Sequence, residues 1–275
     1  MAKEKAILVD TTKCTACRAC QVACKQWNQN PGEKTVNRGS FENPPTLSAH
    51  TWMRILFNEH YDGQMRWLFT KHQCMHCADA ACVKVCPSGA TKHEEVTLAD
   101  GAVFKRVVTN PRTCIGCNYC RVACPFTVPG YQERKRGVYR CTMCFDRVSN
   151  AKPGFDIPAC VKACAPGTLT FGNRDDLLAR AELKVAGLKK AGFADAQVYG
   201  KDELDGLRYM YVLSSSPADY SLPAKPSVPV SVEVWKVLAK PYGALATVGL
   251  VAALVVNRVI NARNRGLEEQ NKLEQ

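Results

Sequence analysis

Sixteen cysteines are the residues of this 275-residue chain best suited to chemistry, and they fall into four groups of four. In chain order the groups are Cys14, Cys17, Cys20 and Cys24; Cys74, Cys77, Cys82 and Cys86; Cys114, Cys117, Cys120 and Cys124; and Cys141, Cys144, Cys160 and Cys164. Groups one and three share the spacing CxxCxxCxxxC at a constant offset of 100 residues. A CxxCxxC loop presents three thiolates within one turn, which suits three corners of an iron-sulfur cube whose fourth ligand comes from elsewhere.

This spacing favours 4Fe-4S clusters over structural zinc and over disulfides. Zinc is typically held by two CxxC pairs and has no use for a triplet of thiolates at three-residue spacing. Three thiols crowded into one turn also cannot all pair with one another as disulfides. Group three ends in Cys124-Pro125, as in bacterial ferredoxins, where the fourth cysteine of each group ligates the cluster of the other group. We therefore predict four 4Fe-4S clusters.

The remaining ionisable residues indicate no catalytic site in the chain itself. Sixteen thiolates satisfy four cubes, so we expect structural or surface roles for the five histidines, His50, His60, His72, His76 and His93. Six basic residues lie beside cysteines in the sequence, where positive charge could raise reduction potentials: Lys13, Arg18, Lys25, Arg112, Arg121 and Arg140. No phosphate-binding glycine loop, CxxCH haem-attachment motif or Ser-His-Asp pattern is legible in the sequence.

The charge of the chain is explained by the same cofactors. A formal charge of +12, from 37 Lys and Arg against 25 Asp and Glu, ordinarily indicates a nucleic-acid or anionic partner. Four oxidised clusters with their thiolates would contribute about −8 and leave roughly +4. The basic residues therefore serve mainly as counter-charge for the clusters, and no nucleic-acid partner is expected.

The elements that must position the cysteines indicate an α+β fold with an internal duplication. Groups two and four end in related segments, ACVKVC at 81–86 and ACVKAC at 159–164, just as groups one and three share their spacing. We expect short strands, cysteine loops and single-turn helices up to about residue 170, which leave little room for large helices.

Two hairpins and one further strand are predicted in this region. A strand at Ile7–Val9 precedes group one. The Asp100-Gly101 pair predicts a hairpin between strands at 96–98 and 103–109. The turn around Gly63 predicts a second hairpin, formed by 51–57 and 65–69.

Beyond group four the pattern becomes helical and then irregular. Asn173 is a suitable N-cap for an amphipathic helix that runs to Ala191, and Gly192 follows as its stop. Residues 214–231 contain four prolines and predict an extended linker over the surface.

An apolar run at 242–256 predicts a membrane anchor. Its 15 residues cover only about 22 Å of a hydrocarbon core of roughly 30 Å. Extension back through Trp235, Val237 and Leu238, with Lys236 and Lys240 reaching to the interface, gives a sufficient span. A buried core helix is the alternative, but the polar residues that follow have nothing further to pack against.

The segment Cys14–Asn28, CTACRACQVACKQWN, followed by the other groups and one apolar span, resembles the iron-sulfur β subunits of membrane-bound formate dehydrogenases in the molybdopterin oxidoreductase family. The resemblance covers the whole chain. It implies an electron-transfer subunit between a catalytic α subunit with a molybdenum or tungsten pterin centre and a cytochrome b-type γ subunit that reduces quinone. Some relatives have a tryptophan in place of one cysteine of group three, whereas this chain keeps Cys117, so four cubes are implied.

The resemblance also implies which cysteines share a cluster, because the family pairs group one with group four and group two with group three. The implied ligand sets are set A, Cys14, Cys17, Cys20 and Cys164; set B, Cys24, Cys141, Cys144 and Cys160; set C, Cys74, Cys77, Cys82 and Cys124; and set D, Cys86, Cys114, Cys117 and Cys120. A sequential pairing, of group one with group two, would instead place Cys24 in the cluster of Cys74, Cys77 and Cys82.

The implied organisation is two ferredoxin-type pseudo-repeat domains, each holding two 4Fe-4S clusters, plus a C-terminal single transmembrane helix. One domain is formed by residues 1–40 with 137–172, and the other by residues 41–136. The rest of the chain is implied to be a helix and linker that pack on partner subunits (173–232), the membrane anchor (233–262) and a polar tail (263–275).

Other roles stay open from the sequence. The same series of four clusters also occurs in sulfur-compound reductase and hydrogenase complexes. A stand-alone polyferredoxin would need the same cysteines. The segment Gln26-Trp27-Asn28 favours formate dehydrogenase. Residues 1–9 carry no export signal, and the family implies a periplasmic cluster domain exported with a signal-bearing α subunit. Charges flanking the span differ little, which leaves the cytoplasmic face as an alternative.

Overall fold

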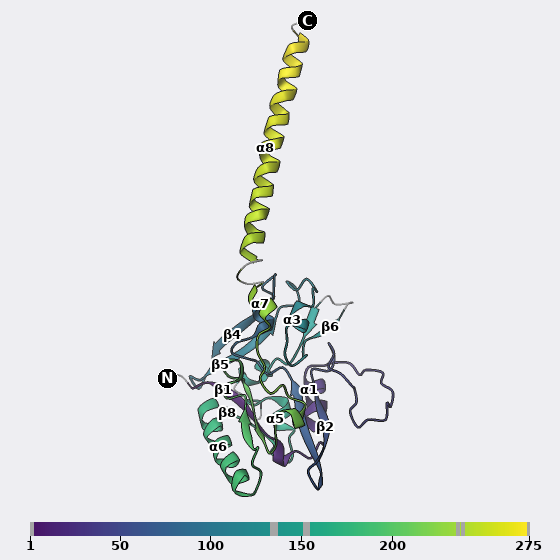
Figure 1. Cartoon of the computed structure of the whole chain (residues 1–275), viewed down its shortest axis with the longest axis vertical. Helices are drawn as coiled ribbons and strands as arrows, with labels where there is room; N and C mark the ends of the chain where they lie inside the picture. The colour runs from purple at the N-terminus through teal and green to yellow at the C-terminus, as the bar shows by residue number, and fades with distance from the viewer. Residues whose placement is uncertain (1–2, 133–136, 151–154, 235–236, 238–239, 274–275) are drawn as a thin grey trace. The chain divides into compact units, whose positions relative to one another are not determined.

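In the computed structural model of the chain, a four-stranded sheet joins the beginning of the sequence to segments that follow the last cysteine (Figure 1). Its strands, in spatial order, are β8 (Leu169–Asn173), β1 (Lys5–Asp10), β10 (Tyr209–Leu213) and β9 (Gln197–Tyr199). β1 pairs antiparallel with β8, with Val9 opposite Leu169, and parallel with β10. Because β1 ends just before group one and the antiparallel β8 begins just after group four, these two groups lie at the same end of the sheet.

The structure describes residues 3–132, 137–150, 155–234, 237 and 240–273. They form two compact units, residues 1–229 and residues 230–275. All sixteen cysteines belong to the first unit.

The two faces of the four-stranded sheet pack against different layers. On β10, Met210 and Val212 join a hydrophobic cluster with α6 (Arg174–Lys190), whereas Tyr209 and Tyr211 join the core that contains cysteines. This follows from the alternation of side chains along a strand. All five residues of β10 are buried, because the strand lies between the α6 layer and the core that contains cysteines.

Three hairpins are present among the described residues. They pair β2 (Met53–Tyr61) with β3 (Met65–Gln73), β4 (Thr91–Thr97) with β5 (Val103–Thr109), and β6 (Gly130–Gln132) with β7 (Gly137–Tyr139). The first two confirm the hairpins predicted from the sequence, with longer strands. The third was not predicted.

Four of the helices beside the cysteines are single turns, as predicted, and the first one is longer. α1 (Ala19–Trp27) has nine residues, and α2 (Ala81–Lys84), α3 (Tyr119–Val122), α4 (Phe145–Val148) and α5 (Ala159–Lys162) have four each. Short 3-10 turns lie at Thr11–Lys13, Glu203–Asp205 and Ala218–Tyr220. α1 packs against α5, and α2 packs against α3.

α6 confirms the predicted amphipathic helix. Asn173 is its N-cap residue, although the Asn173 side-chain amide donates to Asp176 Oδ2 (2.9 Å) instead of capping the backbone with its oxygen. Gly192 follows the helix with a φ of +96°, a conformation that suits glycine. Leu177, Ala181 and Val185, four residues apart, are the buried face.

The proline-rich segment after β10 is irregular, but it is anchored to the core. Tyr220 and Leu222 are 1% and 4% exposed. The Thr11 hydroxyl donates to the Tyr220 hydroxyl (3.1 Å). The linker therefore has fixed points on the first unit, because its two large apolar side chains are more stable when buried.

The second unit consists of α7 (Val230–Val234) and α8 (Lys240–Leu273). Within α8, Leu245–Arg263 is long and apolar enough to cross a membrane, and none of it is buried within the described chain. This stretch begins and ends later than the apolar run at 242–256. Trp235, Lys236 and Leu238, which we expect to extend the span, lie outside the described residues.

Candidate iron-sulfur centres

The loops of groups one and three have the same backbone shape. In group one, Ala16 and Arg18 adopt left-handed φ values of 53° and 60°, and the positions 100 residues later, Gly116 and Asn118, have φ of 73° and 61°. Left-handed backbone is unfavourable for residues other than glycine, so it persists only where the surrounding structure requires it. These residues separate the cysteines of each CxxCxxC loop.

The four thiols of set A line one cavity. It encloses about 400 Å³ including its open mouth, and Val9, Ile55 and Phe69 supply apolar walls. Cys17 is exposed, whereas Cys20 is buried at the start of α1. Burial raises the pKa of the Cys20 thiol to about 12.

The four thiols of set B also lie close together, in a fully buried position. Burial raises the pKa of Cys24 well above its ordinary value, and the neighbouring set B thiols, with Cys141 first, raise it further. The packing of α1 on α5 brings Cys24 and Cys160 to one place. Groups one and four therefore meet at both sets.

Sets C and D are formed around α2 and α3. Burial raises the pKa of Cys77, and Cys74, Cys124 and Cys82 raise it further, so the whole of set C is close by. Burial likewise raises the pKa of Cys120 to about 11; Arg140 acts to lower it, while Cys82, Cys114 and Cys117 act to raise it. Cys86, the remaining member of set D, follows α2 and accepts a hydrogen bond from the backbone N–H of Thr91 (3.4 Å).

The arrangement of these thiols fits iron-sulfur cubes better than zinc. Within the described residues, no three His, Cys, Asp or Glu side chains are grouped as they would be around a single metal ion. A zinc ion with Zn–S bonds of about 2.3 Å holds its four sulfurs about 3.8 Å apart. A cube takes one thiolate at each of four separate irons and so holds the sulfurs farther apart, which suits four thiols around a cavity.

Several donors point at the thiol sulfurs. The backbone N–H of Met143 donates to Cys141 Sγ (3.3 Å), and Arg140 Nη1 donates to Cys82 Sγ (3.1 Å). Hydrogen bonds to cluster sulfurs stabilise negative charge and are among the features that set reduction potentials.

Of the six basic residues singled out from the sequence, Arg140 is the one that the structure buries, at 4% exposed. Lys13, Arg112 and Arg121 are exposed. Arg18 is half-buried and lines the set A cavity, and its Nη2 also donates to the carbonyl oxygen of Phe41. Lys25 is half-buried, and its Nζ donates to the carbonyl oxygen of Pro31 (2.8 Å). Adjacency in sequence was therefore only a partial guide to which charges approach the cysteines, since Arg18 and Arg140 do so.

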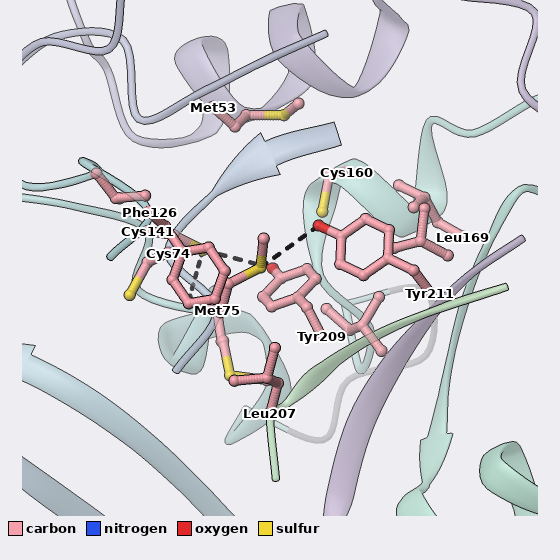
Figure 2. Close-up of a cluster of buried hydrophobic side chains, with 14 of the residues drawn as sticks. Met53, Cys74, Met75, Phe126, Cys141, Cys160, Leu169, Leu207, Tyr209 and Tyr211 are labelled. Atoms are coloured by element: carbon pink, nitrogen blue, oxygen red, sulfur yellow. Dashed lines mark hydrogen bonds between the residues drawn. The ribbon is translucent and has the colours of Figure 1, made fainter. Parts of the chain in front are cut away.

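Three further buried residues were missed by sequence reasoning. Lys71 is 3% exposed and lines the set A cavity. Figure 2 shows Tyr209 and Tyr211 extending among Cys74, Cys141 and Cys160. The run of β-forming residues at 209–213, YMYVL, could have predicted β10, but nothing in the sequence indicates that the strand adjoins the cysteines.

His76 has a structural role. It is 2% exposed, and its Nδ1 accepts a hydrogen bond from the backbone N–H of Val107 (2.9 Å). Burial, aided by Arg140 and other nearby cations, lowers the pKa of His76 well below its ordinary value. The ring is therefore neutral and fixes the loop of group two to β5.

Comparison with known proteins agrees with this geometry. Two models described as 4Fe-4S dicluster domains match residues 13–90 and 65–174, which together include all sixteen cysteines. The chain is 37% identical over 273 residues to the iron-sulfur subunit of the nitrate-inducible formate dehydrogenase of Escherichia coli, covering 98% of this chain and 89% of the relative. The formate dehydrogenase-O iron-sulfur subunit of E. coli is 36% identical, covering 98% and 88%. The formate dehydrogenase 2 subunit beta (cytochrome c-553) of Nitratidesulfovibrio vulgaris is 36% identical, covering 78% and 96%.

Proposed function

Because the chain belongs to the family of formate dehydrogenase iron-sulfur subunits, we propose that it carries electrons between a formate-oxidising α subunit with a molybdenum or tungsten pterin centre and a membrane γ subunit of the cytochrome b type. Its two 4Fe-4S dicluster domains make it an electron-transfer subunit. Each bound cluster would accept and release one electron at a time. The chain's own residues hold the clusters, exclude water and set potentials, and we propose no catalytic site in it.

The observation that carries this function is the meeting of group one with group four and of group two with group three. It supports sets A to D as the ligands of four clusters. α1 packs on α5 and α2 packs on α3, and the set A thiols line one cavity. The matching left-handed positions of groups one and three, and the identical ACVK sequences of α2 and α5, support an origin by duplication.

Burial and proximity support a linear order A, B, C, D for electron transfer. All of set B is buried, whereas set A includes the exposed Cys17, and set D has one buried member, Cys120. Between the two pairs, Cys141 of set B lies close enough to Cys74 of set C to raise its pKa, after burial as the main cause. Sets A and D would therefore be the ends that exchange electrons with partners.

The candidate span Leu245–Arg263 supports membrane attachment beside the γ subunit. The E. coli relatives match over 98% of this chain, so the alignment includes most of this segment. We propose that the cluster domain lies on the periplasmic side, exported together with the α subunit.

A soluble acceptor is the second candidate. The relative from N. vulgaris, whose name includes cytochrome c-553, aligns over 96% of its own length but only 78% of this chain. Part of this chain therefore has no counterpart in that protein. An apolar helix that is exposed within the described chain favours the membrane partner over a soluble cytochrome.

The test is to purify the complex through a tag on this chain and add formate. We expect co-purification of a large pterin-containing subunit, bleaching of the iron-sulfur absorbance by formate, and its recovery on addition of a quinone. A chain that purifies alone, with clusters that do not respond to formate, would instead be a stand-alone polyferredoxin. Recovery with a soluble c-type cytochrome but not with quinone would favour the second candidate.

A further inference from the structure

We propose that Lys71 is a buried positive charge shared by sets A and B, and that it raises the reduction potentials of the clusters held there. The inference rests on the ligand sets proposed above. It assigns a role to a residue that is adjacent to no cysteine in the sequence.

The position of Lys71 is fixed by β3. Thr70 and Lys71 are 0% and 3% exposed, so the strand is covered on both faces at this point. The Thr70 hydroxyl donates to the carbonyl oxygen of Tyr220 (2.7 Å) on one side. On the other side Lys71 lines the cavity of set A.

The Lys71 ammonium has no carboxylate within salt-bridge distance among the residues that the structure describes. Its Nζ lies 4.6 Å from the centre of the Tyr209 ring, whose face attracts cations. Burial acts to lower the pKa of Lys71, but Cys160, Cys141, Cys20 and Cys24, in that order, raise it above its ordinary value. The balancing negative charge is therefore that of the cysteine sulfurs of both sets. Lys71 lines the set A cavity, and the Tyr209 ring under its ammonium has its hydroxyl 3.4 Å from Cys141 Sγ of set B.

Arg140 is the counterpart of Lys71 for the other two sets. It is 4% exposed, its Nη1 donates to Cys82 Sγ at 3.1 Å, and Cys82, Cys74 and Cys120 raise its pKa against the effect of burial. Each cation lies on or directly after a strand that leads to a cysteine of the other two sets. β3 leads to Cys74 of set C yet carries Lys71, and β7 leads to Cys141 of set B and is followed directly by Arg140.

A buried charge at this place acts on the potential directly. Reduction adds one electron to a cluster, supplied by formate oxidation in the α subunit and passed on to the acceptor, and no bond forms or breaks. The added negative charge interacts with Lys71 in a poorly screened interior, so the ammonium stabilises the reduced form more than the oxidised form. Loss of the ammonium should therefore make reduction harder.

The test compares Lys71→Met with Lys71→Arg in the purified complex, by redox titration followed by EPR. In Lys71→Met, the ratio of reduced to oxidised cluster at sets A and B should fall about tenfold at a fixed potential, which corresponds to about 59 mV for one electron. No fall is expected at sets C and D. Lys71→Arg should stay near the wild type.

Two control variants separate the effect of a buried charge near a cluster from mere adjacency to a cysteine in the sequence. Lys13→Met removes an exposed lysine that is adjacent to Cys14 and paired with Asp10, and it should leave all four potentials unchanged. Arg140→Met should lower the potentials at sets C and D and spare set B. Unchanged potentials in an iron-replete Lys71→Met complex would overturn the proposal.

Iron content distinguishes failure of this inference from failure of the proposed function. Fewer than four clusters in the wild type would contradict the ligand sets themselves. If Lys71→Met loses iron while Lys71→Arg retains it, the requirement for charge supports the proposal. Iron loss from both variants would show that Lys71 acts through packing and would overturn it.

Discussion

The hydroxyl of Tyr209 lies 3.4 Å from the Sγ of Cys141, and both groups are buried although 68 residues separate them in sequence. Burial, with Cys141 as the next cause, raises the pKa of Tyr209 well above its ordinary value, so the phenol keeps its proton. The hydroxyl therefore donates a hydrogen bond when Cys141 is a thiolate ligand. The same ring lies beneath the Lys71 ammonium.

Tyr209→Phe removes this donor while keeping the ring. Because a hydrogen bond to a ligand sulfur favours the reduced cluster, we expect the potential at set B to fall by an amount on the order of tens of millivolts. Redox titration with EPR detection measures it. Tyr199→Phe is the control, since its hydroxyl donates to the carbonyl oxygen of Pro223 (2.9 Å) and should leave the potential alone. An equal shift in both variants would contradict the role of the hydrogen bond.

Each chain should contain about sixteen irons, because four sets of four thiolates each hold one cube. Iron and sulfide analysis of the purified complex, with low-temperature EPR of the reduced protein, tests this number. A content near eight irons, or zinc in their place, is the contrary result.

The pairing of the groups can be tested with two serine variants. Cys164→Ser should perturb the cluster held by Cys14, Cys17 and Cys20, because the proposed set A takes its fourth ligand from group four. Cys24→Ser should perturb the cluster of Cys141, Cys144 and Cys160. EPR of both variants decides, since a sequential pairing would instead have Cys24→Ser disturb the cluster of group two.

Glu33 should stabilise the segment between α1 and β2 in a pH-dependent way. Burial acts to raise its pKa, but hydrogen bonds from Ser48 (2.5 Å) and Thr51, with Lys25 at 3.5 Å, lower it below the ordinary value. A lowered folded-state pKa means that the stabilisation is complete above the unfolded value of about 4.3 and is lost as pH falls through the folded value.

Glu33→Gln should therefore increase local opening of residues 28–48 roughly fivefold at pH 7, or about 1 kcal/mol. The difference from the wild type should disappear at low pH. Amide hydrogen exchange measures both effects, with Glu59→Gln on the exposed end of β2 as the control. A difference that is independent of pH would contradict the role of the carboxylate.

Truncation before Trp235 should uncouple quinone reduction and leave dye-linked formate oxidation largely intact. The removed part carries the candidate span but no cysteine or histidine, so it holds no cluster ligand. Assays with quinone and with an artificial dye separate the two activities. Full quinone-linked activity after truncation, or a full-length chain that is soluble without detergent, would contradict the anchoring role.

Local patterns predicted much of the fold because they depend on neighbouring residues. The turn at Asp100-Gly101 and the helix from Asn173 to Gly192 are encoded by short-range preferences for hairpins and helix ends, and both are confirmed. The cysteine spacing likewise indicated the cofactor, in agreement with the matching dicluster domains.

The parts that sequence reasoning missed depend on contacts between distant segments. Lys71 and Tyr209 approach set B only because β3 and β10 pack around it, and neither residue has a local signature. Adjacency to a cysteine pointed instead to Lys13, which the fold leaves in solvent. Charges near a cofactor are selected by the tertiary structure, so a one-dimensional criterion finds only some of them.

The sheet order β8-β1-β10-β9 has a consequence for biogenesis. In the proposed ligand sets, C and D draw all their ligands from residues 74–124, a short stretch of newly made chain, whereas A and B each combine cysteines from residues 14–24 with cysteines from residues 141–164. β1 must then wait for β10, about 200 residues later, before the sheet that supports sets A and B is complete. Iron delivery to this subunit should therefore follow an order, with the middle of the chain loaded first and the ends closed last.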